Sequence, residues 1–177
     1  MGFGLIAQLR GGVVERLRVT PLSRLALLLG SVLRDVVQLL VQASLLVMVA
    51  WFFGLQADIA GVALVFGLLA LLGLLAASCS YALALLLREE NAFASTLQFF
   101  LLPLLLLSGI LLPLTLAPAW VQAIASANPF SYAVDAARAL FSGNLGDASV
   151  LYGFGVVAAL VLPALWWAAR SFRRATA

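Results

Sequence analysis

Four polar residues interrupt the first long apolar stretch of this chain, at spacings of four, three and four positions. They are Ser31, Asp35, Gln38 and Gln42. Such spacing places them on one face of an α-helix, where their hydroxyl, carboxylate and amide groups can exchange hydrogen bonds or line a polar route. Polar groups in a membrane helix are costly when they face lipid, so this face is expected to meet protein or water. A hydrogen-bonded seam between helices and the lining of a substrate cavity both fit the pattern.

A second group of candidate residues lies in a proline-rich block at positions 101–140. Its prolines are Pro103, Pro113, Pro118 and Pro129. Each proline removes a backbone donor, yet the only charges in the block are Asp135 and Arg138, which can pair at a spacing of three on a helix. Irregular backbone at membrane depth must be buried in protein or line a water-filled cavity, because lipid cannot hydrogen-bond it. The block is therefore typical of a transport route.

Several kinds of catalytic chemistry are missing from the sequence. The chain has no histidine and one cysteine, Cys79, so it offers neither a serine–histidine pair nor a histidine or thiolate metal site. It also lacks the GxxxxGK[ST] loop that cradles nucleotide phosphates and the dinucleotide fingerprint. We expect no catalytic residues, metal or cofactor in this chain, and no hydrolysis of ATP by it.

The elements that must position these residues are membrane helices. Hydrophobic residues make up 65% of the chain and charged residues 10%, a balance that places it in the polytopic membrane class. Four runs are long enough for about 20 helical residues across the hydrocarbon core. They cover approximately residues 32–53, 59–87, 91–112 and 149–169. The expected fold is all-α and integral to the membrane, with about four transmembrane helices.

Between the last two runs, residues 113–144 predict a pair of short helices. Pro118 can open one over residues 118–127 and Pro129 another over residues 129–141, since proline is favoured at the first turn. The second would end at the Ser142-Gly143-Asn144 turn. The pair either re-enters the membrane or lies on its surface, anchored by Trp120 and Tyr132.

The arginines predict the orientation. Nine of the ten lie before or at the start of the first run, between the second and third, or after the fourth. The acids Asp58 and Asp147, together with the Asp135 and Arg138 pair, lie on the other side. The positive-inside rule makes the arginine-rich face cytoplasmic, so both termini are expected in the cytoplasm. The modest net charge of +3 belongs to this topology, and nucleic acid is not an expected partner.

Two ordered sets of residues carry a resemblance to a known family. The first set comprises Ser108, Gly109, Pro113, Pro118, Trp120, Asn128, Pro129, Tyr132, Asp135 and Arg138. The second is the segment ERLRVTP, which includes Glu15, Arg16, Leu17, Arg18, Thr20 and Pro21. Together they resemble the ABC transporter type-2 permeases, the membrane subunits of bacterial and archaeal exporters. The resemblance covers essentially the whole chain.

The resemblance implies roles for both sets. Residues 11–24 would form a short amphipathic coupling helix that docks into a separate ATPase subunit, although the residues alone also fit a lipid-contacting anchor at the membrane surface. The residues of the first set would form an outer gate built on the re-entrant helix pair. ATP and magnesium would bind the partner ATPase, a second permease copy would complete the transporter, and the location would be a prokaryotic plasma membrane.

The family usually has six transmembrane helices, with the arginine-rich segment after the second. Here that segment begins within a dozen residues of Met1, so the sequence is interpreted as a single permease domain that lacks roughly the first two helices. The expected substrate is amphipathic: a drug, antibiotic, lipid or glycan. A membrane scaffold that does not transport is the alternative, and an ion-coupled secondary transporter is a further one.

Overall fold

The computed structural model describes residues 24–55, 57–87, 89–110 and 117–175. These residues form helices α3 (Arg24–Phe52), α4 (Ile59–Leu87), α5 (Glu90–Leu106), α6 (Ala119–Ala125), α7 (Pro129–Phe141) and α8 (Ala148–Ala175). The described ranges contain no strand, which confirms the all-α fold expected from the sequence. The predicted coupling helix at residues 11–24 lies outside them, apart from its last residue.

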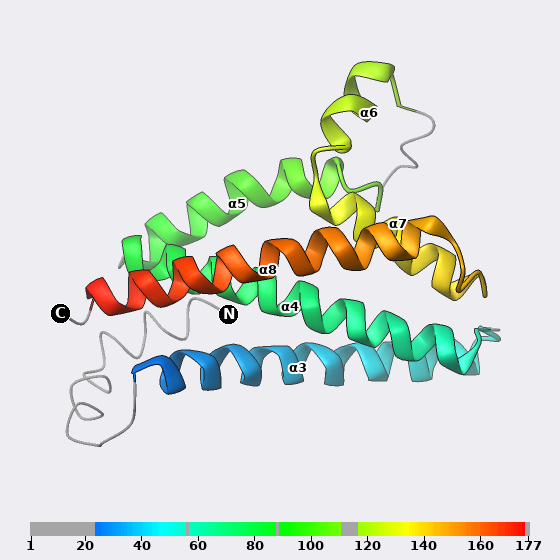
Figure 1. Ribbon diagram of the computed structural model, residues 1–177, viewed down its shortest axis with the longest axis horizontal. Coiled ribbons are helices and arrows are strands. Elements are labelled where there is room, and N and C mark those ends of the chain that lie inside the picture. Colours follow the sequence, from blue (N-terminus) through cyan, green and yellow to red (C-terminus); the bar gives the residue numbers. More distant parts are fainter. Residues whose placement is uncertain (1–23, 56, 88, 111–116, 176–177) are drawn as a thin grey trace.

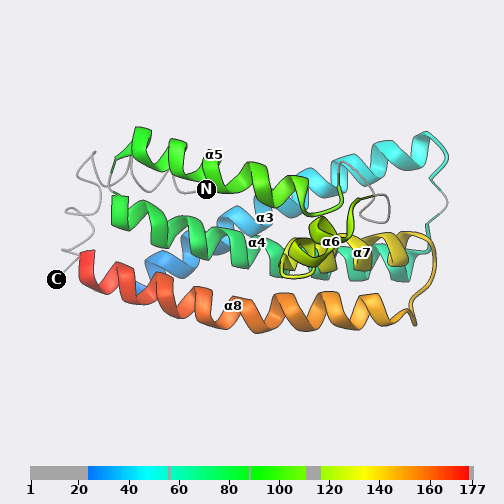
Figure 2. The same ribbon diagram turned by 90° about the horizontal axis from the view of Figure 1, so that it is seen from above.

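The bundle is built on α4, which contacts most of the other helices. Figures 1 and 2 show α8 running alongside α4. In the view of Figure 2, α3 crosses α4 obliquely, and α4 lies between α5 and α8. The sequence of α4 is apolar all round, as expected for a helix surrounded by protein and lipid. At its crossing with α3, Gly73 lets the two backbones approach, since a Cβ there would lie 3.3 Å from Cγ2 of Val36.

Three described helices are long and apolar enough to cross a membrane. The qualifying segments are Leu29–Phe52, Ile59–Leu87 and Ala148–Phe172. The third predicted run, residues 91–112, corresponds to α5, which is apolar but has only 17 residues and ends at Leu106 rather than near residue 112. At a rise of 1.5 Å per residue it is about 26 Å long, slightly short of the roughly 30 Å hydrocarbon core.

The two ends of the bundle carry different charged residues. The start of α3, the end of α4, the start of α5 and the end of α8 lie at one end (Figure 1), which includes Arg24 and Arg170 among the described residues. Asp58 and Asp147 lie at the opposite end. The Oδ1 of Asp147 accepts a hydrogen bond from the backbone N–H of Ser149 at 2.8 Å, which caps α8 and lowers the pKa of this carboxyl.

Helix α7 is packed into the bundle rather than lying outside it. Ala133 and Ala136 belong to the same buried cluster as Leu68 of α4 and Val157 and Val161 of α8. Val157 and Val161 lie well within the α8 span, so α7 reaches the depth of the membrane-spanning helices. In Figure 1, α5 ends part-way along the bundle, and α7 continues from there toward the far end.

Two glycines allow this close packing of α7. A Cβ on Gly153 of α8 would lie 2.5 Å from Cβ of Ala136 and 2.9 Å from the carbonyl oxygen of Tyr132. A Cβ on Gly61 of α4 would lie 2.5 Å from the carbonyl oxygen of Leu140. Contacts shorter than 3.0 Å do not occur for real Cβ atoms, so both neighbours of α7 need glycine at these positions.

Candidate functional site

The junction between α5 and α7 gathers most of the described residues of the predicted outer gate. Helix α5 ends at Leu106, and Gly109 adopts a positive φ of 76° in the turn that follows. The buried Ser108 donates its hydroxyl hydrogen to the Leu105 carbonyl oxygen at 2.7 Å, and its Oγ accepts from the Ile110 N–H at 3.4 Å. A serine hydroxyl that bonds this way closes the turn and ends the helix before the predicted span is complete.

Asn128 ties the start of α7 to the end of α5. Its Oδ1 accepts from the Phe130 N–H at 3.1 Å, which caps α7, and its Nδ2 donates to the Leu104 carbonyl oxygen at 3.0 Å. Pro129 is the first residue of α7, where its missing N–H leaves no donor unpaired. The last carbonyls of a helix have no partner within it, so the buried amide of Asn128 satisfies one that lipid could not.

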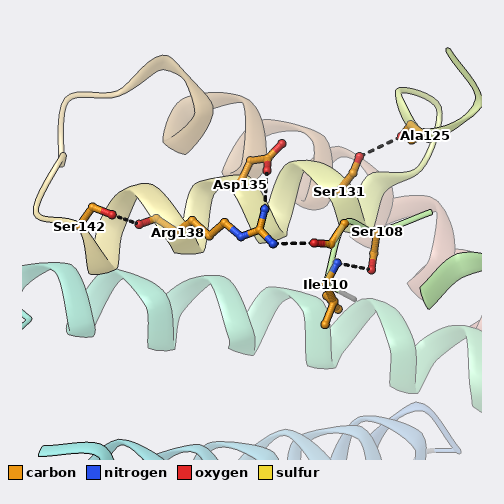
Figure 3. Close-up of polar contacts among 8 residues, drawn as sticks. Ser108, Ile110, Ala125, Ser131, Asp135, Arg138 and Ser142 are labelled. Atoms are coloured by element: carbon orange, nitrogen blue, oxygen red, sulfur yellow. Dashed lines mark hydrogen bonds and ion pairs between the residues drawn. The ribbon is translucent and has the colours of Figure 1, made fainter. Parts of the chain in front are cut away.

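Arg138 makes the second link between α7 and α5. Its Nη2 donates to the Gly109 carbonyl oxygen at 2.5 Å, and its Nη1 lies 3.8 Å from Oδ1 of Asp135 (Figure 3). The pairing predicted from the three-residue spacing is therefore present. Both side chains of the pair are about half exposed, at 51% and 55%, so the ion pair itself contributes little to stability. The guanidinium also sits near the C-terminal end of α5, where the helix dipole favours positive charge.

The corner between α6 and α7 is closed by two further hydroxyls. Ser131 is buried and its Oγ donates to the Ala125 carbonyl oxygen at 2.9 Å and the Asn128 carbonyl oxygen at 2.7 Å. The hydroxyl of Tyr132 donates to the Ser126 carbonyl oxygen at 2.8 Å. Tyr132 therefore holds the corner together, a role that the sequence did not predict.

Two other predicted gate residues, Pro118 and Trp120, lie at the start of α6 and remain apart from the junction. Pro118 precedes the helix, with its carbonyl oxygen accepting from the Val121 N–H at 2.9 Å. Trp120 is 68% exposed. Pro113 and the six predicted coupling residues lie outside the described ranges.

The polar face predicted on α3 forms a separate feature. Asp35 is buried at 5% exposure, and its Oδ2 accepts from the hydroxyl of Tyr81 on α4 at 2.7 Å. This bond is a seam between helices, one of the two roles that the spacing left open. Gln38 and Gln42 are exposed, and with Asp35 and Leu39 they line a recess of ≈ 220 Å³ on α3. Ser31 is half-buried on the same helix.

Sequence reasoning missed two residues that the structure places in these features. The hydrogen bonds of Ser131 cannot be predicted from the sequence, because a serine two residues after a proline does not by itself indicate which groups its hydroxyl will bond. The hydrogen bond of Tyr81 is easier to predict, because a tyrosine buried in an apolar helix needs a partner for its hydroxyl. Within the described ranges, no three histidine, cysteine or acidic residues gather to hold a metal ion. In the α5–α7 junction, polar side chains of α7 and its cap bond to backbone carbonyls at the end of α5.

Comparison with known proteins identifies the family. A model of the ABC-2 type transporter family matches residues 1–142, which is most of the chain. The chain belongs to the ABC-2 type transporter family. Its relatives are transport permeases, and the bundle of apolar helices is consistent with a protein of the membrane.

Three relatives illustrate the similarity. The daunorubicin resistance ABC transporter permease protein DrrB1 of Streptomyces coeruleorubidus is 34% identical over 82% of this chain and 52% of its own length. The ycf38 protein of Pyropia yezoensis, named as a transport permease, is 32% identical over 80% of this chain and 49% of its own. The ycf38 protein of Porphyra purpurea is 31% identical over 81% and 50%.

The ABC-2 chain described here spans about half the length of these relatives. No solved structure is significantly similar to it.

Proposed function

We propose that this chain is a permease subunit of an ATP-binding cassette exporter, which moves an amphipathic substrate out of the cell. ATP and magnesium bind a separate ATPase subunit, and a second permease copy completes the translocation path in a prokaryotic plasma membrane. Both termini lie in the cytoplasm. The observation that carries the proposal is the family match over residues 1–142, which includes the segment that resembles a coupling helix.

The α5–α7 junction supports a route through the bundle. Helix α5 stops part-way along the bundle, and α7 continues from there toward the far end (Figure 1). The two helices together therefore cover the length that a single membrane-spanning helix would cover. Interrupted helices at membrane depth expose backbone groups that can face a substrate or a cavity. Asn128 and Arg138 attach α7 to the end of α5 through hydrogen bonds to the carbonyls of Leu104 and Gly109. Passage of a substrate between the two helices requires those hydrogen bonds to break and re-form.

The packing of α7 favours a re-entrant helix over one lying on the membrane surface. A surface helix buries one face shallowly in the headgroup region. Instead, Ala133 and Ala136 pack against Val157 and Val161, well within the α8 span. The re-entrant interpretation of residues 113–144 therefore has packing in its favour as well as sequence pattern.

The coupling role can be tested by co-purification from native membranes. Charge reversal of Arg16 and Arg18 to glutamate should remove the ATPase subunit from the purified chain, because the docking contact would lose two positive charges. Reversal of Arg173 and Arg174 is the matched control, since it changes the net charge equally at the same predicted membrane face. The ATPase should stay bound to this control.

Two outcomes would contradict the coupling assignment. An ATPase that remains bound after reversal of Arg16 and Arg18 shows that it docks elsewhere. A chain that never carries an ATPase, in either wild-type or control form, indicates a scaffold that does not transport.

A further inference from the structure

The buried carboxylate of Asp35 on α3 is held by a tyrosine of α4. It lies about 9 Å along the helix axis from Leu29, where the α3 span begins. The Tyr81 hydroxyl donates to Oδ2 at 2.7 Å and so fixes the plane of the group. A carboxylate can accept about four hydrogen bonds, so Tyr81 uses only part of its capacity.

Among the described side chains, Arg34 is the cation paired with this carboxylate, and the pairing is loose. Nη2 of Arg34 lies 3.5 Å from Oδ1 of Asp35, and the arginine side chain is 64% exposed. Adjacent residues on a helix point about 100° apart, so Arg34 and Asp35 do not face each other well. A competing cation could displace the guanidinium, because the 3.5 Å separation is long for an ion pair and the Arg34 side chain is mostly exposed.

The recess beside Asp35 has the composition of a binding site for an amine. Its lining consists of Asp35, the amides of Gln38 and Gln42, and the apolar side chain of Leu39. An ammonium group offers three donors, which these carboxylate and amide oxygens can accept. The volume of ≈ 220 Å³ is several times the roughly 30 Å³ that one water occupies in the liquid.

We infer that this recess binds the protonated amino group of an amphipathic amine. The ammonium lies against Oδ1 of Asp35 and the two glutamine oxygens, and the apolar body extends along the exposed aliphatic residues of α3. Leu45 and Val49 lie on that face of the helix, one and two turns beyond Gln42. This inference rests on the proposed function and specifies its substrate class as organic cations.

The binding test needs no ATPase, so its outcome is separate from that of the proposed function. The full chain would be placed in nanodiscs of zwitterionic phosphatidylcholine, with empty nanodiscs as the background. The probe is 4-phenylbutylammonium, and 4-phenylbutanol is its neutral comparator. Saturation-transfer NMR titrations would give the affinity of each. Wild type should bind the amine about tenfold or more tightly than the alcohol, as expected for hydrogen bonds to a charged acceptor.

Three variants separate a binding role from a structural one. Asp35→Asn should remove the preference for the amine, because the amide keeps the Tyr81 bond but loses the charge. Arg34→Gln should tighten amine binding by about two- to fivefold, since it removes the competing cation. Tyr81→Phe, which breaks the seam and leaves the carboxylate, should retain the preference. Helix content by circular dichroism would verify that each variant is folded.

The inference is overturned if wild type binds amine and alcohol equally, or if Asp35→Asn leaves the preference unchanged. Gln42→Leu keeps the test decisive should Asp35→Asn fail to fold. This change leaves the charge and the seam in place but removes one lining amide, and it should weaken amine binding by about three- to tenfold. Unchanged amine binding in Gln42→Leu would place the amine outside the recess and contradict the inference.

Discussion

Asn128 connects two helices through both ends of one side-chain amide. Its oxygen caps α7 and its nitrogen satisfies the Leu104 carbonyl of α5. The residue is buried, so water cannot take over either bond. A single side chain therefore controls both the start of α7 and its attachment to the helix before it.

Replacing Asn128 with alanine should lower the free energy of unfolding by about 1–3 kcal/mol, because a cap is lost and a buried acceptor is left without a donor. Unfolding by SDS titration in mixed micelles would measure the change. Asn144→Ala is the matched control, since Asn144 is exposed in the turn after α7. Equal effects of the two changes would mean that the amide of Asn128 does not hold the junction.

At the residue scale, local partners could be predicted and distant ones could not. The start of α7 at Pro129, its end near Ser142 and the Asp135–Arg138 pair all follow from spacings of a few residues. The bonds of Asn128 to Leu104 and of Arg138 to Gly109 span 24 and 29 positions. Such bonds depend on how the helices pack, which no local pattern encodes.

At the element scale, α7 depends on two glycine contacts more than on its own length. It has 13 residues, and isolated helices of that size are marginal without tertiary packing. Gly153 of α8 brings the α7 backbone close enough for the alanines of α7 to be buried. A single methyl group added to α8 at Gly153 should therefore push α7 away from its packed position.

Gly153→Ala should destabilise the protein by about 1–3 kcal/mol, because its Cβ would overlap Ala136 and the Tyr132 carbonyl. Gly155→Ala is the matched control on the same helix, with no atom within 4 Å of its added Cβ. It should be neutral or stabilising by up to about 1 kcal/mol, because alanine favours helix over glycine. Thermal unfolding followed by circular dichroism would compare them. A Gly153→Ala protein as stable as Gly155→Ala would contradict the described α7–α8 packing.

The end of α5 shows where apolar pattern alone overestimates a helix. The sequence remains apolar beyond Leu106, so it predicts a membrane span that extends to residue 112. The helix stops earlier because the hydroxyl of Ser108 bonds back to the Leu105 carbonyl and Gly109 takes a positive φ. Serine and glycine mark the turn in the sequence, but their signal is weaker than that of the apolar residues around them.

At the scale of the whole molecule, the two ends of the bundle differ in their helices and charges, and this difference is the basis of the proposed orientation. The start of α3 at Arg24 and the end of α8 beyond Arg170 share one end of the bundle, and α7 reaches the opposite end (Figure 1). In the proposed orientation, the end of the bundle with Arg24 and Arg170 faces the cytoplasm and the α5–α7 junction lies toward the outer side. The Asp35 recess then opens near the inner leaflet, where an amphipathic amine would first meet the transporter.

The most direct test of the proposed function is ATP-driven transport in inside-out membrane vesicles that contain this chain and its co-purified ATPase. A fluorescent amphipathic amine should accumulate inside the vesicles when hydrolysable ATP is added, and accumulation should disappear on charge reversal of Arg16 and Arg18. The reversal of Arg173 and Arg174 should leave it intact. Accumulation that follows an imposed ion gradient without ATP, or no accumulation with the ATPase bound, would contradict the proposal.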